Sequence, residues 1–502
     1  MFLDKAGRIM LYNSTRGNDS GRTAAYVIKN GIAADGGLFV PESIPTLSPE
    51  ALEKLKGMSY AERAAEILGM FLTDYSAEEL RMAADTAYSA ERFGKVTTPI
   101  SVAEGNSVLE LWHGPTSAFK DMALQIMPHL LSLSLGKCGE EKDALILVAT
   151  SGDTGKAALA GYADVPRVRI QVFYPSEGVS PVQKLQMATQ DGANVSVCGI
   201  KGNFDDAQSA VKRIFTSADA AKKIDGEGLF FSSANSINWG RLAPQIVYYI
   251  SAYLDMVAAG SVAMGEPINI TVPTGNFGNI LAAYIAKLMG LPVKTMVCAS
   301  NQNNILTDFF TTGVYDKRRP FYTTSSPSMD ILISSNLERL LYFTLGAEKC
   351  AALMKDLNEK GIYTVDEATK TALAADFAAL YGDETATAET IARYFKAGYL
   401  CDPHTAVALY CADKYKAESG DNTPMLVAST ASPYKFPRAV LKALGEEKGG
   451  SDFDCIDSLE KLSGIRPPKA LAELKTKAVR FEGVTDKADI DAKVYAFAAE
   501  KL

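Results

Sequence analysis

Hydrophobic positions change their spacing near residue 95. Between residues 48 and 92, apolar side chains recur every three or four positions among Ala, Glu and Met, which is typical of one face of an α-helix. Beyond that point, short apolar runs alternate with stretches of helical spacing. The runs are DALILVA (143–149), RIQVFY (169–174), ANVSVCG (193–199), GLFFSS (228–233), INITVP (268–273), VKTMVCA (293–299) and PMLVAS (424–429). This alternation predicts an α/β fold with parallel or mixed sheets flanked by helices, preceded by an extra helical N-terminal unit.

A chain of 502 residues is too long for one compact core, so we expect several structural units. Helical spacing returns between residues 336 and 400, and the charged, glycine-containing segment GEEKGGSD (445–452) predicts a linker. The predicted units are an N-terminal domain (1–95), a large domain (96–140 together with 234–440), a small domain (141–233) and a C-terminal extension (441–502).

Composition narrows the choice of function. The net charge is -8 and the pI is about 5.3, so no basic surplus exists to neutralise nucleic-acid phosphates. The seven cysteines are scattered without a C-x-x-C pair, which favours free thiols in a reducing compartment. The N-terminal text does not resemble a signal peptide, and no apolar run reaches the ~18 residues of a membrane span. We therefore expect a cytoplasmic protein.

Two loops share one layout of apolar strand, small polar residues and helix. They are LILVAT-SGDTG-KAALAGYA and INITVP-TGNFGN-ILAAYIA. Such a loop presents unpaired N–H groups at the positive end of a helix, which suits a phosphate. An ordinary strand-to-helix turn would look the same, but two such loops favour two phosphates bound close together. Neither loop matches G-x-x-x-x-G-K-[ST] or G-x-G-x-x-G, so ATP and NAD are disfavoured.

Lys120 occupies an unusual position for a lysine. The segment HGPTSAFKDMAL (113–124) reads as a turn followed by a helix that continues through AFKDMALQIMPHLL, and apolar residues surround the lysine. Most lysines are solvated surface groups. Here burial and a positive helix end would favour the neutral amine, which forms Schiff bases. The three histidines, His113, His129 and His404, support neither a Ser/His/Asp triad nor a metal cluster, and we expect no metal.

HGPTSAFKDMALQ resembles the cofactor-lysine segment of threonine synthases, a branch of the fold-type II pyridoxal-phosphate enzymes, which share the fold of the tryptophan synthase β-subunit. The resemblance covers nearly the whole chain and is closest to the larger form found in fungi and enteric bacteria. The other matching segments are NSTRG (13–17), AADGGLFVPESIP (33–45), ATSGDTGKAA (149–158), SANSINWGRL (233–242), VPTGNFGN (272–279), SNQNNIL and TTGVY (300–315), SPSMDILISSNLERLL (326–341), DPHTAV (402–407) and STASPYKFP (429–437).

The resemblance implies roles for individual residues. Lys120 would bind the cofactor pyridoxal 5'-phosphate covalently and move protons. The cofactor phosphate would contact Gly275, Asn276, Phe277, Gly278 and Asn279. Asp153 would lie by the pyridoxal hydroxyl, and Thr430 would face the pyridine nitrogen. The substrate's phosphate and carboxylate would be received by Thr150, Ser151, Lys156, Asn235, Ser236 and Arg241. One departure is Ser432, which stands where relatives commonly have histidine.

The implied reaction, the last step of threonine biosynthesis, converts O-phospho-L-homoserine and water into L-threonine and phosphate. A phospholyase that releases 2-oxobutyrate would share most of these motifs. An amino-acid dehydratase would leave Arg241 and Lys156 without a substrate phosphate, and a non-catalytic binding module would not need Lys120 and the GNFGN loop intact. The larger-form relatives suggest a monomer that acts on a small-molecule substrate, without nucleic acid or membrane. The alternative for Lys120 is a solvated surface lysine, and the alternative for Arg241 is a structural arginine with a carboxylate partner.

Overall fold

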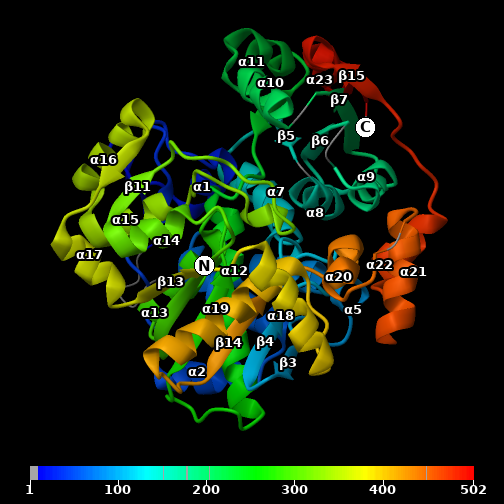
Figure 1. Ribbon diagram of the computed structural model, residues 1–502. Coiled ribbons are helices and arrows are strands. Elements are labelled where there is room, and N and C mark those ends of the chain that lie inside the picture. Colours follow the sequence, from blue (N-terminus) through cyan, green and yellow to red (C-terminus); the bar gives the residue numbers. More distant parts are fainter. Residues whose placement is uncertain (1–8, 151, 177–178, 203, 448, 502) are drawn as a thin grey trace.

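The computed structural model describes residues 9–150, 152–176, 179–202, 204–447 and 449–501 (Figure 1). Its strands form two main sheets, each flanked by helices, and two small two-stranded sheets. The predicted α/β class with parallel and mixed sheets is confirmed. The division of the chain into domains stays a prediction.

The larger sheet has six strands and is mixed. Its neighbouring strands are parallel except β3 and β4, which form an antiparallel pair at one edge. In spatial order the strands are β13 (Phe377–Tyr381), β10 (Val293–Ser300), β9 (Ile268–Pro273), β14 (Met425–Ser429), β4 (Asn106–Glu110) and β3 (Ile100–Ala103).

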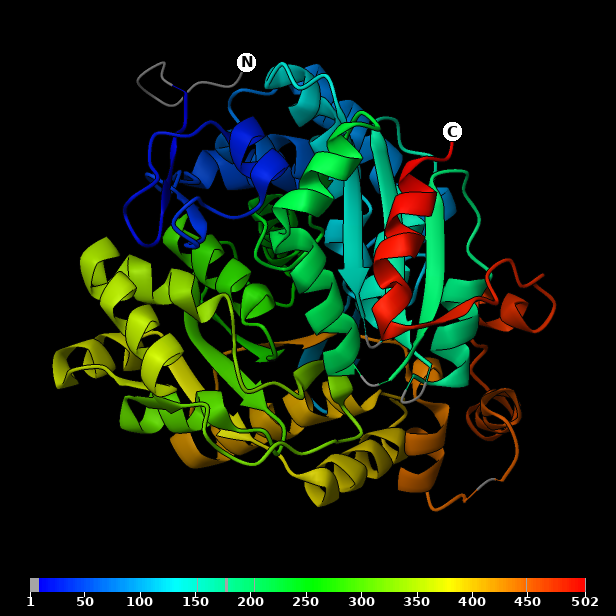
Figure 2. The ribbon, with the colours of Figure 1, turned by 90° about the horizontal axis from the view of Figure 1, so that it is seen from above.

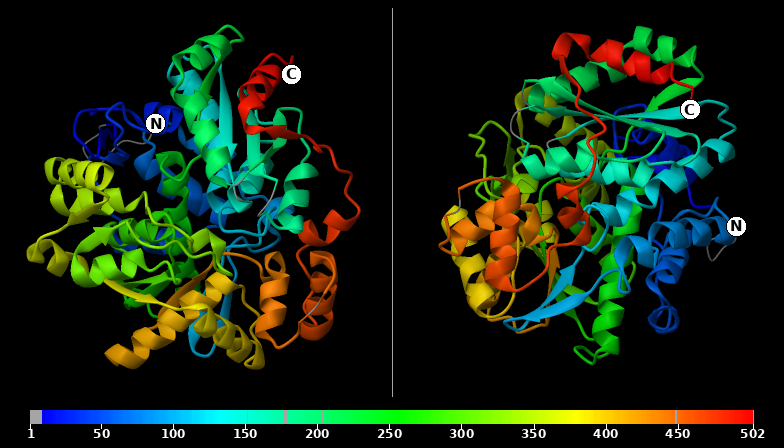
Figure 3. Two further views of the ribbon diagram at one scale, coloured as in Figure 1. Left: turned by 45° about the horizontal axis from the view of Figure 1, so that its top comes forward. Right: turned by 90° about the vertical axis from the view of Figure 1, so that its right-hand side faces the viewer.

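The second sheet has five strands, and all of its neighbours are parallel. In spatial order they are β15 (Val484–Asp486), β7 (Val195–Lys201), β6 (Val168–Pro175), β5 (Asp143–Ala149) and β8 (Leu229–Ser232). β15 comes from the C-terminal segment, which runs across the molecule to reach this sheet (Figure 3). Each of the seven apolar runs in the sequence corresponds to one strand of the two sheets.

The N-terminal unit is mainly helical, as its spacing predicts. Two of its helices begin with a capping box, in which Ser59 pairs with Glu62 and Ser76 pairs with Glu79. The elements are β1 (Tyr12–Ser14), α1 (Ala24–Asn30), β2 (Phe39–Pro41), α2 (Pro49–Lys56), α3 (Tyr60–Phe71), α4 (Ala77–Ala87) and α5 (Ala90–Phe93).

Helices cover both main sheets. Around the five-stranded sheet these are α8 (Asp153–Tyr162), α9 (Pro181–Ala188), α10 (Phe204–Thr216), α11 (Ala218–Asp225) and α23 (Ile490–Ala498). Around the six-stranded sheet and its neighbours these are α6 (Asp121–Leu124), α7 (Met127–Lys137), α12 (Trp239–Ala258), α13 (Gly278–Leu288), α14 (Ile305–Thr312), α15 (Leu337–Leu345), α16 (Ala347–Lys360), α17 (Glu367–Ala374), α18 (Glu384–Lys396), α19 (Pro403–Ser419), α20 (Pro437–Ala443), α21 (Asp452–Ser463) and α22 (Lys469–Ala472). Among the helices described, none is long and apolar enough to cross a membrane.

The hydrophobic core is centred on α12. This helix is buried over nearly its whole length and packs against α3, α6 and α13. A separate apolar cluster lies under the five-stranded sheet, where Ile490 and Phe497 of α23 pack with Phe173 and Ile224. Figure 2 shows α23 lying against the strands of this sheet. The residues predicted as a C-terminal extension therefore contribute both a strand and core side chains to the fold.

Two expectations of secondary structure were wrong. The predicted helix through AFKDMALQIMPHLL is split into α6 and α7. Pro128 has no N–H to bond the carbonyl group of Leu124, which interrupts the helical ladder. Gly161 of α8 packs against the carbonyl group of Leu124, and a Cβ on this glycine would lie 1.8 Å from the Leu124 oxygen. In addition, residues 336–400 return to helix as expected but also contain two strands that were not expected, β12 (Ile362–Thr364) and β13.

Candidate active site

Lys120 precedes the first residue of α6, and its side chain is 10% exposed. Its Nζ donates a hydrogen bond to the Oγ of Ser328 at 3.1 Å and lies 3.7 Å from Oδ2 of Asp153. Burial lowers the pKa of the amine to about 8, and the cations of Lys435 and Arg241 act in the same direction. At pH 7 about a tenth of the amine is therefore in its neutral, nucleophilic form, far more than for an ordinary lysine.

Asp153 begins α8 and faces the amine of Lys120 from the other main sheet. Its Oδ1 lies 2.6 Å from Nζ of Lys435 and accepts a hydrogen bond from Gln183. Burial alone would raise the pKa of Asp153, but the cations of Lys435 and Lys120 outweigh it and lower this pKa. The carboxylate is therefore ionised at neutral pH and could accept a hydrogen bond from a pyridoxal hydroxyl.

The second glycine loop connects β9 to α13. Phe277 adopts a left-handed conformation (φ 61°), a strain that is compensated by packing of its buried ring against Phe310 and Phe377. Gly275 admits no side chain, because a Cβ there would lie 2.4 Å from the carbonyl oxygen of Ser328. Gly278 meets no comparable obstacle. Gly275 thus lets the loop lie directly against the segment that contacts Lys120.

This loop has the donors that a phosphate requires. The backbone N–H groups from Gly275 to Asn279 form no hydrogen bond with the described parts of the chain, and they precede or begin α13. The Oδ1 of Asn279 accepts hydrogen bonds from Tyr248 and Tyr249, while its buried Nδ2 has no partner among the residues that the structure describes. Free N–H groups at a helix N-terminus and an unsatisfied buried amide fit a cofactor phosphate.

The lysine segment is joined to the end of β14. The N–H of Phe119 donates to the carbonyl oxygen of Thr430, and the N–H of Ser432 donates to that of Ser117. The hydroxyl of Thr430, a buried residue, has no hydrogen-bond partner in the described ranges, so it is available to a pyridine nitrogen. Ser432, the departure from the resembling family, accepts from the N–H of Tyr434 and caps a short 3-10 turn.

The first glycine loop lies between β5 and α8. The Oγ1 of Thr150 accepts hydrogen bonds from the N–H groups of Gly152 and Gly155, so this side chain supports the loop. Ser151 lies outside the described residues. Lys156 is buried on α8 and donates to Oε1 of Gln190 at 2.5 Å. Burial lowers the pKa of this lysine to about 7, and the nearby cations of Lys477 and Lys435 add to the effect.

Arg241 lies in the first turn of α12 and is buried. Its Nη1 donates to the carbonyl oxygen of Ala234 at 2.9 Å. Within the described residues no carboxylate pairs with it, so the structural alternative for this arginine finds no partner there. Burial lowers its pKa to about 10. A buried guanidinium without a counter-ion is expected to bind an anion.

Asn235 and Ser236 lie just before α12, where Asn235 is exposed and Ser236 is partly buried. The two phosphate regions are linked through buried Asn336, whose Nδ2 donates to the carbonyl oxygens of both Ser236 and Asn276. Arg339 holds Asn336 and also donates to the carbonyl oxygen of Ile237. These contacts couple the predicted substrate side to the predicted cofactor side.

Sequence reasoning missed four residues of this site. Lys435, Ser328, Asn336 and His404 all lie in segments that resemble the family, SPSMDILISSNLERLL, DPHTAV and STASPYKFP. Each bonds to a partner that is distant in sequence. One signal could have indicated them. These polar residues lie in motifs whose apolar residues already suffice to build the core, so the polar ones need another reason to be there.

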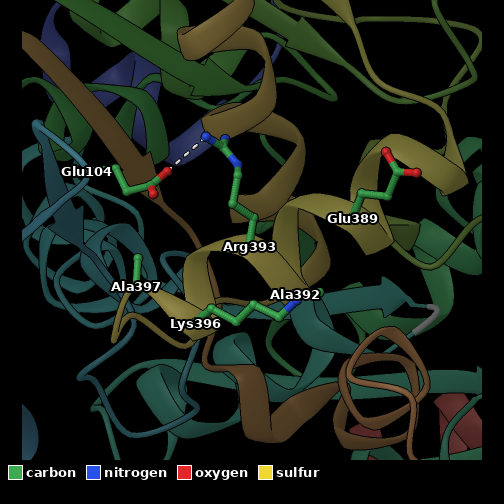
Figure 4. A pocket seen from close by; sticks show the side chains of 6 residues that line it. All are labelled: Glu104, Glu389, Ala392, Arg393, Lys396 and Ala397. Atoms are coloured by element: carbon green, nitrogen blue, oxygen red, sulfur yellow. Dashed lines mark hydrogen bonds and ion pairs between the residues drawn. The ribbon is translucent and has the colours of Figure 1, made fainter.

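An open hollow of about 530 Å³ lies elsewhere, beside α18 (Figure 4). Arg393 in its wall already pairs with Glu104 at 2.8 Å and with Asp413. None of the predicted site residues lines it. This hollow is therefore not part of the candidate site around Lys120.

Comparisons with known proteins agree with this geometry. The model of the pyridoxal-phosphate dependent enzyme family matches residues 108–430. Models of the threonine synthase N terminus and of the threonine synthase C-terminal region match residues 11–88 and 405–494. The chain is therefore a fold-type II enzyme that depends on pyridoxal phosphate. Its buried lysine and its phosphate loop fit this class, and its cofactor is pyridoxal 5'-phosphate.

Within that class, the chain belongs to the threonine synthase family. It is 37% identical to the threonine synthase of Schizosaccharomyces pombe, covering 86% of this chain and 89% of that protein. The crystal structure of yeast threonine synthase superposes with a TM-score of 0.86 at 31% identity, covering 97% of each chain. The pyridoxal-phosphate-bound threonine synthase of Brucella melitensis gives 0.87 at 35% identity, covering 98% of this chain and 100% of that one.

Human threonine synthase-like 1 is 43% identical over 82% of this chain. The chain spans 57% of the length of that relative.

Proposed function

We propose that this enzyme is a carbon–oxygen lyase that converts O-phospho-L-homoserine and water into L-threonine and inorganic phosphate. The observation that carries the proposal is the excess of positive charge around Lys120. Arg241 is a buried cation, and Lys156 is a buried amine that is about half protonated at pH 7. Neither has a carboxylate hydrogen-bond partner in the described residues, and neither belongs to the 275–279 loop with its free N–H groups. If the cofactor phosphate binds to that loop, Arg241 and Lys156 are free to bind a second phosphate.

The residues of the chain divide the work as follows. The N–H groups of the 275–279 loop would hold the cofactor phosphate, Asp153 would face the pyridoxal hydroxyl, and Thr430 would face the pyridine nitrogen. When bound, pyridoxal phosphate supplies an electron sink for charge that develops on the substrate. A neutral hydroxyl at Thr430 would leave the pyridine nitrogen largely unprotonated, which favours elimination and replacement.

Lys120 would bind the cofactor covalently and be released when the substrate's amine takes its place. The free amine, with its lowered pKa, would then remove a proton from the α-carbon, give it up, and remove a second one from the β-carbon. Two protons return to the product, one to the γ-carbon, which becomes the methyl group, and one to the α-carbon. Arg241 and Lys156 would bind the γ-phosphate, stabilise it as it leaves, and orient the substrate so that water adds to the β-carbon. Asn235 and Ser236 would receive the remaining substrate anion with Thr150 and Ser151.

Product analysis tests this function. The purified chain with pyridoxal phosphate should release equal amounts of phosphate and threonine from O-phospho-L-homoserine, and the Lys120→Ala variant should release neither. Equal amounts of phosphate and 2-oxobutyrate would establish a phospholyase instead. Activity on hydroxy amino acids without phosphate release would indicate a dehydratase, in which Arg241 and Lys156 have no role in substrate binding. A monomeric state, a cytoplasmic location and the absence of nucleic-acid partners stay predictions.

A further inference from the structure

Ser328 lies between the lysine and the cofactor loop. It belongs to a short 3-10 turn, Pro327–Met329. Its Oγ accepts the hydrogen bond from Nζ of Lys120 at 3.1 Å, and its carbonyl oxygen lies against Gly275. A shift of this one residue would therefore move both the partner of the amine and the wall of the phosphate loop.

A buried histidine fixes the backbone of Ser328. The N–H of Ser328 donates to Nε2 of His404 at 3.1 Å. A backbone N–H can only donate, so Nε2 must accept and the ring proton must be on Nδ1. Nδ1 faces Oδ2 of Asp402 at 2.6 Å, where it donates. The contacts thus select one tautomer of His404.

Asp402 is itself held rigidly. It is the N-cap of α19, and its Oδ1 accepts from the N–H and the hydroxyl of Thr405. Its Oδ2 also accepts from the N–H of His404. Both Asp402 and His404 are almost fully buried. The start of α19 therefore supports a hydrogen-bonded chain that runs from Asp402 through His404 and Ser328 to Lys120.

We propose that Ser328 holds the amine of Lys120 whenever this amine is free, and that His404 and Asp402 are positioning residues that set Ser328. The proposal rests on the role of Lys120 in the proposed function. A lysine side chain has four flexible bonds, so an amine released from its cofactor must be held in one place to take a proton from the substrate. The hydroxyl of Ser328 supplies that fixed acceptor.

The test compares Ser328→Ala and His404→Gln with the parent. In the full-length chain stripped of cofactor, acetylation of Lys120 is followed against pH by peptide mapping, which measures the pKa of the amine. The charged groups that face the amine, Asp153, Lys435, Arg241 and Asp121, are unchanged in these variants. The control is His129→Gln, which changes a half-buried histidine on α7.

The hydroxyl of Ser328 stabilises the ammonium form, so Ser328→Ala should shift the acetylation midpoint to lower pH. In the loaded enzyme the same variant should lower kcat about tenfold, with KM changed less than about twofold. His404→Gln should shift both measurements in the same direction by less, and His129→Gln should shift neither. If His404→Gln does not fold, Asp402→Asn serves instead, because its amide drives the ring proton towards Nε2 and against the N–H of Ser328.

The proposed function is checked separately by borohydride reduction of the loaded parent. Label on Lys120 together with an unchanged midpoint and kcat in Ser328→Ala overturns the role of Ser328 and leaves the proposed function intact. Effects in Ser328→Ala without any in His404→Gln or Asp402→Asn overturn the positioning role of the histidine. Label on a different lysine overturns the proposed function, and the present inference with it.

Discussion

Replacing Arg241 with methionine should make the protein more stable and unresponsive to phosphate. Burial lowers the pKa of this guanidinium from 12.5 to about 10. At neutral pH the group is charged in both the folded and the unfolded state, so the shift corresponds to a cost of about 3 kcal/mol to folding. This cost is fully present below pH 10 and decreases as the pH rises through it.

The substitution also removes the hydrogen bond to the carbonyl oxygen of Ala234, which costs about 1–2 kcal/mol. The expected net gain for Arg241→Met is therefore about 1–2 kcal/mol in the free energy of unfolding without phosphate. In the parent, phosphate at 100 times its Kd should add about 2.7 kcal/mol. The variant should show no such gain.

Urea unfolding at saturating pyridoxal phosphate, with and without inorganic phosphate, measures both effects. Saturating cofactor keeps the 275–279 loop filled, so added phosphate reports on the second site. Arg63→Met is a matched control, because Arg63 is equally buried but pairs with Asp255 at 2.7 Å. It should lose stability and keep the phosphate response. If Arg241→Met loses stability as Arg63→Met does, and phosphate still stabilises it, the assignment of Arg241 is refuted.

Three further changes test the site. Lys120→Ala should abolish the visible band that borohydride traps and lower kcat by at least about a thousandfold, below detectable product release, whereas in the stripped parent the acetylation of Lys120 should rise through pH 8. Gly275→Ala should lose cofactor on gel filtration because its Cβ meets a carbonyl oxygen, and Gly136→Ala, which has open space, should retain it. Lys435→Met should lower the free energy of unfolding by up to about 3–5 kcal/mol, because Asp153 would keep only the more distant Lys120 as a counter-ion, and it should raise the acetylation midpoint of Lys120. Retained cofactor in Gly275→Ala would contradict the assignment of the phosphate loop. An unchanged midpoint in Lys435→Met would contradict the effect of Lys435 on the amine of Lys120.

The strands that the sequence predicts correctly are those buried on both faces. Runs such as INITVP are apolar at nearly every position because helices cover a parallel sheet on both sides. β13, with the sequence FAALY, lies at the sheet edge, is only partly buried and consists largely of helix-favouring residues, so its local pattern resembles the helices around it. β15 has three residues, too few for any periodicity.

The candidate site divides in a similar way. Lys120 and the loop around Gly275 could be proposed because a local pattern of small, apolar and charged residues marks them. The ion pair of Lys435 with Asp153 and the hydrogen bond of His404 to Ser328 join positions far apart in the chain. Local periodicity contains no information on such pairs, and only the fold brings them together.

The pairing of β15 with β7 affects the order in which the molecule can be completed during synthesis. β7 is made long before β15, and until then it presents an unpaired strand edge. The apolar cluster that α23 later covers is also exposed during that interval. A nascent chain that pauses before residue 484 therefore exposes an unpaired strand edge that can associate with other chains, although the other four strands of the sheet are already made. Such chains should be bound by chaperones more than finished ones.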